Sequence, residues 1–212
     1  MDLAASWLVP PKALPDIYPA KIGDLLVASF EEVLGKQNFE KALRQAGLDI
    51  SATDVPDLPF GAPARLSEAL EEIYGEQAGH GLCLRAGRVM FHRGLRVFSG
   101  ILGLSHRSFR LLPSGQKVLR GMDLLAWLLN HYSDQRVRVE KHSRELLFIN
   151  EKCPHCWNLK KVSPCCQLTV GVLQEGLAWA ANGKQYSVEE ISCRANGDSA
   201  CTYRIIRKPL AL

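Results

Sequence analysis

Cysteines are concentrated in the last quarter of this 212-residue chain. Six of the seven occur in one segment, as Cys153 and Cys156, Cys165 and Cys166, Cys193, and Cys201. A single cysteine such as Cys83 is most simply an ordinary buried residue. Six in one segment favour a metal site or redox chemistry, because clustered thiols in a reducing compartment rarely form disulfides. The segment 153–201 is therefore expected to fold so that these thiols meet.

The first pair, Cys153 and Cys156, has the spacing of two ligands presented by one tight turn. Zinc bound by thiolates needs such closely spaced ligands, at about 2.3 Å from the metal, to complete a tetrahedron. Pro154 also fits a redox motif, which normally opens a helix after a strand. A long cysteine-bearing loop follows here instead. The pair therefore favours a metal over redox chemistry.

The remaining cysteines are predicted to lie at the ends of regular elements. Cys166 follows Pro164 and precedes an apolar helical pattern, so its thiolate is stabilised by a helix N-terminus. Cys193 and Cys201 flank the turn of a predicted hairpin, where opposing positions approach to about 5 Å. Glu190 is a candidate oxygen ligand. It shares a metal with Cys193 only if the strand ends or bulges between them, because positions three apart point to opposite faces.

Hydrophobic periodicity predicts an α+β fold with an antiparallel sheet. Helices come first and strand pairs follow, with one late helix between two hairpins. Gly75 and Gly79 are expected to bracket a break between helices, and Gly87 and Gly94 to loosen a long one. Asn38 is the predicted N-cap of the second helix. The predicted helices span 20–34, 38–48, 64–74, 81–98, 114–132 and 166–181, and the predicted strands span 136–141, 145–150, 186–192 and 200–206.

Composition and charge limit the classes of function. Residues 1–19, with four prolines, are expected to form an extended arm, and 20–207 a single domain with a helical part (20–132) and a β-rich part (136–207). The net charge of +4 is too small and too evenly spread to indicate direct nucleic-acid binding. No apolar run approaches the roughly 20 residues of a membrane span, and the N-terminus has no signal-peptide pattern. We therefore expect a cytoplasmic protein.

Several motifs together resemble the 4-vinyl reductase domain family. They are the runs 153–157, 171–179 and 189–201, with weaker matches at 74–75 and 81–88. The resemblance covers about residues 20–207. It implies a fold similar to TRAPP transport-complex subunits, in which helices pack on an antiparallel sheet around an apolar ligand pocket, often in a homodimer. Members of the family are linked to bacteriochlorophyll synthesis, or serve as sensor domains of transcription activators that respond to phenols and other aromatics.

The resemblance also implies a zinc site. In the aromatic sensors the ion is held by a cysteine at a helix start, a glutamate, a cysteine three residues on, and a cysteine eight further. These positions carry over to Cys166, Glu190, Cys193 and Cys201. The interval from Cys166 to Glu190 is one residue longer than expected, so Cys165 is an alternative ligand. Cys153 and Cys156 lie outside this set, as a second site, a competing ligand pair or free thiols.

A ligand pocket is expected against the sheet, within the helical segment 85–132. Its candidate contacts carry aromatic or cationic side chains, which suit an aromatic or carboxylate-bearing ligand. Each also has a simpler interpretation: a solvated helix face, a capped helix end or the core. The candidates are Arg88, Phe91, His92, Trp127 and His131.

These observations predict a non-enzymatic protein with a structural zinc ion that binds a hydrophobic, aromatic or tetrapyrrole-like molecule as a sensor or carrier. No GxGxxG turn indicates a nicotinamide site, and no catalytic residues are assigned. Flavin and an Fe–S cluster remain open alternatives. A second hypothesis is a reductase or auxiliary factor in bacteriochlorophyll synthesis. A third is a partner-binding scaffold that uses an isologous dimer surface. A sensor or carrier would pass its ligand or signal to another, unidentified protein.

Overall fold

The computed structural model describes residues 17–18, 20–50, 58–104 and 107–211. The helices are α1 (Ala20–Leu34), α2 (Lys36–Gln45), α3 (Ala62–Tyr74), α4 (Glu76–Phe98), α5 (Arg107–Arg110), α6 (Ser114–Tyr132) and α7 (Gln167–Ala180), with short 3₁₀ turns η2 (Pro154–Cys156) and η3 (Arg194–Asn196). The strands are β1 (Ile17–Tyr18), β2 (Leu58–Pro59), β3 (Val137–Lys141), β4 (Glu145–Asn150), β5 (Val188–Ser192) and β6 (Cys201–Ile206).

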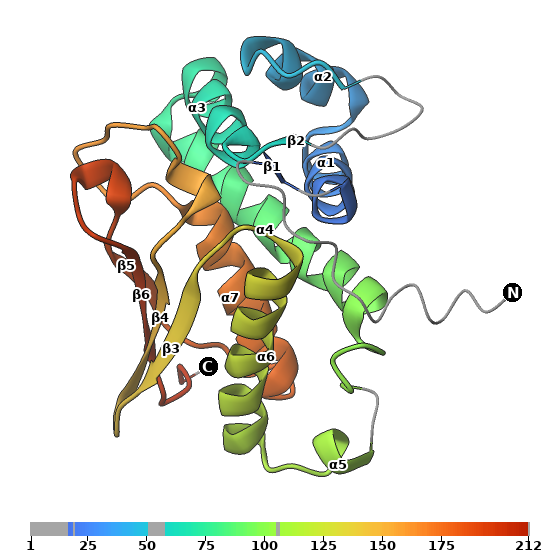
Figure 1. Cartoon of the computed structure of the whole chain (residues 1–212), viewed down its shortest axis with the longest axis vertical. Coiled ribbons are helices and arrows are strands. Elements are labelled where there is room, and N and C mark those ends of the chain that lie inside the picture. Colours follow the sequence, from blue (N-terminus) through green and yellow to red (C-terminus); the bar gives the residue numbers. More distant parts are fainter. Residues whose placement is uncertain (1–16, 19, 51–57, 105–106, 212) are drawn as a thin grey trace, which may run out of the picture.

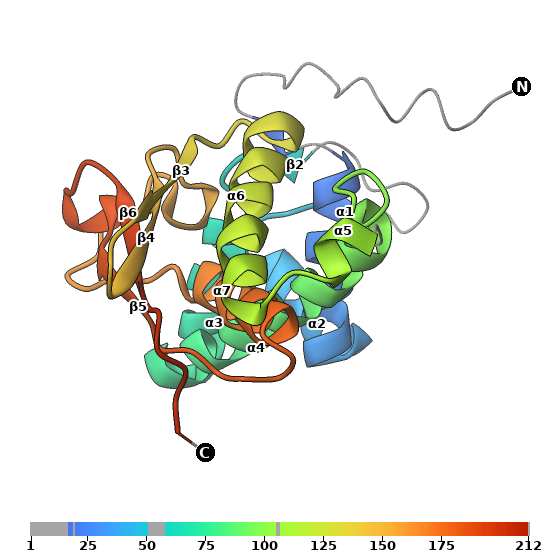
Figure 2. The ribbon, with the colours of Figure 1, turned by 90° about the horizontal axis from the view of Figure 1, so that it is seen from below.

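The main sheet has four antiparallel strands in the order β3-β4-β6-β5. Helices α6 and α7 pack against one another and contact this sheet, and α4 packs along α7 (Figure 1). Helices α1 and α3 pack on α4, and α2 contacts both of them. Figure 2 shows α6 and α7 between the sheet and the N-terminal helices. The predicted α+β fold, with helices first and one late helix between two hairpins, is confirmed.

Buried side chains form two apolar clusters that follow this layering. One joins the N-terminal helices and includes Leu26, Phe30 and Leu70. The other lies between α6, α7 and the sheet, and includes Tyr203 and Leu173. All six cysteines of the segment 153–201 belong to this second cluster. The cysteines are therefore inside the core on which the sheet and the late helix pack.

The last hairpin contains an irregularity in β5, between Glu190 and Ser192. Glu190 pairs with Tyr203 and Ser192 pairs with Thr202, so the register shifts between Glu190 and Ser192. A bulge of this kind inserts one residue and redirects the side chains that follow. The strand thus meets the condition under which Glu190 and Cys193 can share a metal, and both side chains are buried.

Two glycines set how closely α4 and α7 approach. A Cβ atom built on Gly87 would lie 2.1 Å from the carbonyl oxygen of Leu168, and one on Gly171 would lie 2.1 Å from that of Leu84. Any larger residue at either position would force the helices apart. The expectation that Gly87 loosens a helix was wrong: α4 continues through it, and Gly87 allows backbone-to-backbone packing.

The starts of α2 and α4 also differ from the predicted ones, because each helix begins directly after a glycine. Helix α2 begins after Gly35, whose φ of 74° is in the left-handed region. Asn38 lies inside α2 and donates its side-chain N–H to the carbonyl oxygen of Leu34 at 3.0 Å, so it is not the N-cap. Helix α4 begins directly after Gly75, with φ 85°. Gly79 lies within α4, where a Cβ would approach the backbone of Glu71 in α3 to 2.8 Å.

The N-terminal prediction is tested only at its end. Within the expected arm 1–19, only Ile17 and Tyr18 are among the described residues, and they pair with β2. Residues 51–57, between the predicted helices 38–48 and 64–74, also lie outside that set. No helix in the described part of the chain is both long and apolar enough to cross a bilayer.

Candidate metal centre and apolar cavity

Three separate parts of the chain bring their cysteines to one place. The turn η2 supplies Cys153 and Cys156, the N-terminus of α7 supplies Cys166, and the last hairpin supplies Cys193 and Cys201. All of these thiols are buried. Each of these cysteines is a free thiol. The sulfurs of Cys156 and Cys201, for example, lie 3.3 Å apart. The cluster therefore consists of free thiols held within contact distance by packing.

Two groups of four donors are compact enough to hold a metal ion. The donor atoms within each group lie within 4.8 Å of one another. One group combines Cys166, Glu190, Cys193 and Cys201, the set implied by the family resemblance. The other combines Cys153, Cys156, Cys166 and Cys201. Both groups are fully buried, which suits a structural ion closed off from solvent.

Glu190 reaches the cluster from β5. Its Oε2 accepts a hydrogen bond from the backbone N–H of Cys166 at 2.8 Å, which also caps α7. Burial raises the pKa of Glu190 to about 9, and the nearby Cys193 adds to the shift. Without a neighbouring cation this carboxyl therefore holds its proton at neutral pH. A divalent cation would favour the ionised form instead.

Two of the buried thiols show the same need for a cation, whereas hydrogen bonding with other thiols, first of all Cys156, lowers the pKa of Cys193. Hydrogen bonding with neighbouring thiols, first of all Cys153, and then burial raise the pKa of Cys166 and of Cys201 well above the ordinary thiol value. Several thiolates at this spacing repel one another in a buried site. Metal binding releases the thiol protons and compensates the negative charge. The electrostatics thus match a set of metal ligands better than a set of inert thiols.

Two buried polar atoms beside the cluster lack partners within the described residues: Oε1 of Glu190 and the hydroxyl of Tyr203. Buried polar groups are almost always paired, so each exception calls for an explanation. For Glu190 an ion among the sulfurs supplies one, since its carboxylate oxygen is a donor in the same compact group. Three thiolates and one carboxylate in a compact group of four donors fit zinc among the common ions.

Cys165 lies at the edge of the cluster. Its sulfur contacts that of Cys193 at 3.9 Å, but neither compact donor group includes it. The fourth donor that the structure brings to Cys166, Cys193 and Cys201 is Glu190. The sequence left open whether Cys165 or Cys166 is the ligand at the start of α7. Both compact donor groups contain Cys166, which makes Cys166 the candidate ligand.

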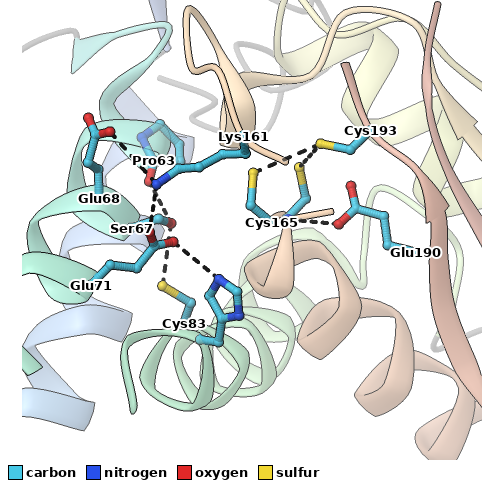
Figure 3. A network of polar contacts seen from close by, with 11 residues as sticks. Pro63, Ser67, Glu68, Glu71, Cys83, Lys161, Cys165, Glu190 and Cys193 are labelled. Carbon is cyan, nitrogen blue, oxygen red and sulfur yellow. Dashed lines mark hydrogen bonds and ion pairs between the residues drawn. The ribbon is translucent and has the colours of Figure 1, made fainter. Parts of the chain in front are cut away.

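The loop before α7 is anchored to the helical layer by Lys161. Its Nζ lies 2.6 Å from a carboxylate oxygen of Glu71 and 3.8 Å from one of Glu68, both on α3. Figure 3 shows this contact on one side of Cys165, with Cys193 and Glu190 on the other. Because the ion pairs are partly buried, they hold the loop more firmly than exposed pairs do. The cysteine cluster is thereby tied to both halves of the domain.

An apolar cavity of about 110 Å³ lies between α1, α4, α6, α7 and β4. Aliphatic and aromatic side chains make up most of its wall. Gln135, His155 and Thr169 are the lining residues with an amide, imidazole or hydroxyl group. Such a cavity, apolar with a few polar groups, is typical of sites for small hydrophobic molecules.

His155 is the polar group of the cavity that remains available. Gln135 is paired with Ser133 and Asn150, and the Thr169 hydroxyl hydrogen-bonds to Nδ1 of His155. Nε2 of His155 has no partner within the described residues, although only 6% of this side chain is exposed. A buried nitrogen of this kind is suited to bind a polar group of a ligand. Sequence reasoning missed it; the one available signal was its position between Cys153 and Cys156.

Of the five ligand contacts predicted from the sequence, Phe91 lines the cavity. Arg88 and His92 lie on the same helix but point to its outer side. Arg88 donates to the side-chain oxygen of Gln174 at 2.8 Å, and His92 lies 2.8 Å from a carboxylate oxygen of Glu175. These pairs tie α4 to α7 at the surface.

The other two predicted contacts, Trp127 and His131, also lie away from the cavity. Their rings stack on the outer side of α6, with centroids 4.1 Å apart, and Trp127 is 40% exposed. Nδ1 of His131 lies 2.8 Å from the carbonyl oxygen of Trp127, as the helix-end interpretation of this histidine suggested. The faces of α6 that meet the cavity carry Met122, Leu125 and Leu129 instead.

No family model matches the chain, and no curated protein matches it either. Solved structures of H-NOX proteins share its fold. A Cs H-NOX protein carrying 4-cyano-L-phenylalanine is 14% identical over 90% of this chain and 97% of that one, with a TM-score of 0.58. An H-NOX from S. oneidensis in the Fe(II)NO ligation state is 10% identical over 88% and 98%, with a TM-score of 0.55.

A further H-NOX structure, from work on heme distortion in that family, is 15% identical over 91% of this chain and 97% of that one, with a TM-score of 0.55. The TM-scores indicate a common fold, whereas identities this low leave the function open. The H-NOX-like architecture nevertheless agrees with a helical layer and an antiparallel sheet built around an internal cavity.

Proposed function

We propose that this protein binds a hydrophobic small molecule, aromatic or tetrapyrrole-like, in the cavity between its helical layer and its sheet. The observation that carries the proposal is the apolar cavity with Nε2 of His155 in its wall, an atom that has no hydrogen-bond partner in the described part of the chain. The apolar wall favours a hydrophobic ligand, and the imidazole selects one with a polar group at a defined position. The protein acts as a sensor or carrier and passes its ligand or signal to another protein, in a homodimer.

A structural zinc ion, held by Cys166, Glu190, Cys193 and Cys201, is the second part of this proposal. It is supported by the compact, buried donor set and by the unpaired Oε1 of Glu190. The ion would fasten the N-terminus of α7 to the last hairpin. Because Thr169 and Trp179 of α7 line the cavity, fixing this helix also fixes the cavity wall.

Two similarities suggest what class of ligand to test. The late cysteine motifs resemble those of the 4-vinyl reductase domain family, to which we propose that the chain belongs. The H-NOX structures of similar fold include one described in terms of heme. Aromatic compounds and tetrapyrroles are therefore the first candidates. Flat rings suit the side chains of Phe91, Phe98 and Trp179 in the cavity wall, and a tetrapyrrole, several times larger than the cavity of about 110 Å³, requires the cavity to widen.

Binding of 1-naphthol and of naphthalene, measured by titration calorimetry, tests the site. We expect the protein to bind both and to prefer 1-naphthol, because its hydroxyl can pair with Nε2 of His155. Replacing His155 with Phe removes this partner while keeping an aromatic ring. The preference for 1-naphthol should then fall by about 1–2 kcal/mol, or roughly 5- to 30-fold.

His131→Phe is the matched control, since this histidine is stacked on Trp127 away from the cavity. It should leave the preference unchanged. Hemin, followed by its visible absorption, tests the tetrapyrrole class in the same proteins. If neither naphthalene compound nor hemin binds to the folded, metal-loaded protein, the proposed function is wrong.

A further inference from the structure

The two compact donor groups have two cysteines in common. Both contain Cys166 and Cys201, while each adds two donors of its own. We propose that the cluster holds two divalent metal ions bridged by the thiolates of Cys166 and Cys201. Cys153 and Cys156 complete the shell of the second ion. This inference rests on the zinc site of the proposed function and adds an ion to it.

The sulfur spacings match those around a tetrahedral ion, and Cys166 and Cys201 form an edge common to both donor groups. With metal–sulfur bonds of about 2.3 Å, two sulfurs on one tetrahedral ion lie about 3.8 Å apart. The sulfurs of Cys166 and Cys201, the shared edge, are separated by 3.8 Å. That of Cys193 lies 3.8 Å from Cys166 and 3.9 Å from Cys201, on the side of the first ion.

The side of the second ion has matching contacts. The sulfur of Cys153 lies 3.8 Å from that of Cys166, and the sulfur of Cys156 lies 3.3 Å from that of Cys201. Each shared thiol thus contacts a thiol of both donor groups, as a bridging ligand requires. A single ion in the first group would leave Cys153 and Cys156 as uncoordinated thiols in contact with its ligands.

Disulfides and iron–sulfur clusters fit this arrangement less well. A disulfide pairs two sulfurs at about 2.05 Å, whereas Cys166 contacts three other sulfurs at comparable, longer distances. In an iron–sulfur cluster, inorganic sulfide occupies the bridging positions between the irons. Here protein sulfurs lie in those positions, at Cys166 and Cys201. The geometry therefore favours bare ions such as zinc.

Binding of the second ion leaves the net charge of the cluster unchanged. When it enters, the thiols of Cys153 and Cys156 release their two protons to solvent, and the ion brings two positive charges. The net charge of the buried cluster is therefore the same with one ion or two. Backbone donors stabilise the thiolates further: the N–H of Arg194 donates to the sulfur of Cys201 at 3.4 Å. The N-terminus of α7 favours a thiolate at Cys166.

The second ion would lie beside the ligand cavity. Cys153 and Cys156 flank His155 on the turn η2, and His155 faces the cavity. Coordination of both cysteines would fix this turn, and with it the imidazole. The second ion thus links the metal centre to the proposed ligand site.

Cadmium-113 NMR of the full chain, loaded with ¹¹³Cd²⁺ after removal of its native metal, tests the bridged pair. We expect two resonances of equal area, each split by coupling to the other metal through the shared thiolates. Elemental analysis of the zinc-loaded protein should give two equivalents per chain. Cys153→Ser should give a single cadmium resonance without metal–metal splitting, and one equivalent of zinc per chain.

Cys165→Ser is the matched control, because Cys165 lies in the same cluster but outside both donor groups. It should keep two coupled resonances. One equivalent in the wild type, or two resonances without mutual splitting, would overturn the bridged pair. Loss of an ion from Cys165→Ser would overturn the assignment of ligands to the two ions. One equivalent would still leave the single zinc of the proposed function in place, whereas no metal at all would reject both.

Ligand preference tests whether the second ion fixes His155 in the cavity wall. In Cys153→Ser the preference for 1-naphthol over naphthalene should fall in the same direction as in His155→Phe. An unchanged preference, with one ion lost, would overturn the role of the second ion in fixing His155.

Discussion

Replacing Cys166 with serine should remove the bound metal and lower the Tm by roughly 8–16 °C. Cys166 belongs to both compact donor groups, so its loss breaks every metal shell that the described residues offer. Loss of a structural metal is among the few single changes that cost about 4 kcal/mol or more. For a chain of this size each kcal/mol shifts the Tm by about 2–4 °C. Calorimetry and elemental analysis of the same samples measure both effects.

Chelation distinguishes the metal from ordinary packing. A strong chelator should lower the Tm of the wild type close to that of Cys166→Ser and leave the variant unchanged. Cys83→Ser is the control: Cys83 is buried beside Ser67, away from the cluster, and burial raises the pKa of its thiol to about 12. This variant should keep its full metal content. A wild-type Tm that does not respond to complete removal of metal would contradict a structural role.

Gly87→Ala should destabilise the fold by about 3 kcal/mol, and thus lower the Tm by roughly 6–12 °C. The new Cβ would lie 2.1 Å from the carbonyl oxygen of Leu168, a backbone atom that moves only if α7 moves. Because α7 begins at the cluster and lines the cavity, the shift should also weaken metal binding. Thermal unfolding and a zinc competition titration measure the two consequences.

Gly81→Ala is the matched control for this prediction. Gly81 lies in the same helix, α4, but nothing lies within 4 Å of a Cβ built on it. Alanine in an open helical position is favoured over glycine by up to about 1 kcal/mol. This variant should therefore be as stable as the wild type or slightly more so. Equal stability of the two variants would contradict the close crossing of α4 and α7.

Periodicity and chemistry predicted the parts of the fold that local sequence determines. The helix 114–132 and the hairpin 136–150 appear almost as expected, because their apolar spacing matches one secondary structure only. Strand geometry set only a condition at β5, that Glu190 and Cys193 can face one ion only across a bulge or a strand end, and the structure meets it with a register shift between Glu190 and Ser192. The late position of the cysteines likewise indicated that they meet.

Long-range packing set the features that the sequence did not predict. Gly87 and Gly171 lie far apart in the chain, and nothing local shows that each faces the other's helix backbone. The cavity is lined by residues of five helices and strands and of the turn η2, so no single periodic pattern indicated that Phe91 would face it while Trp127 would not. His155 was overlooked for the same reason: its cysteine neighbours suggested metal binding, but its direction depends on where η2 packs.

The central claim is that a metal centre holds the wall of a ligand cavity in place. Native mass spectrometry of the full chain, purified without chelator, tests this most directly, because one spectrum reports bound metal and retained small molecules together. We predict a mass above that of the polypeptide by two divalent ions less the displaced protons, and a further adduct after incubation with 1-naphthol that is weaker in His155→Phe. A spectrum containing only the metal-free chain, with no 1-naphthol adduct, would contradict this claim.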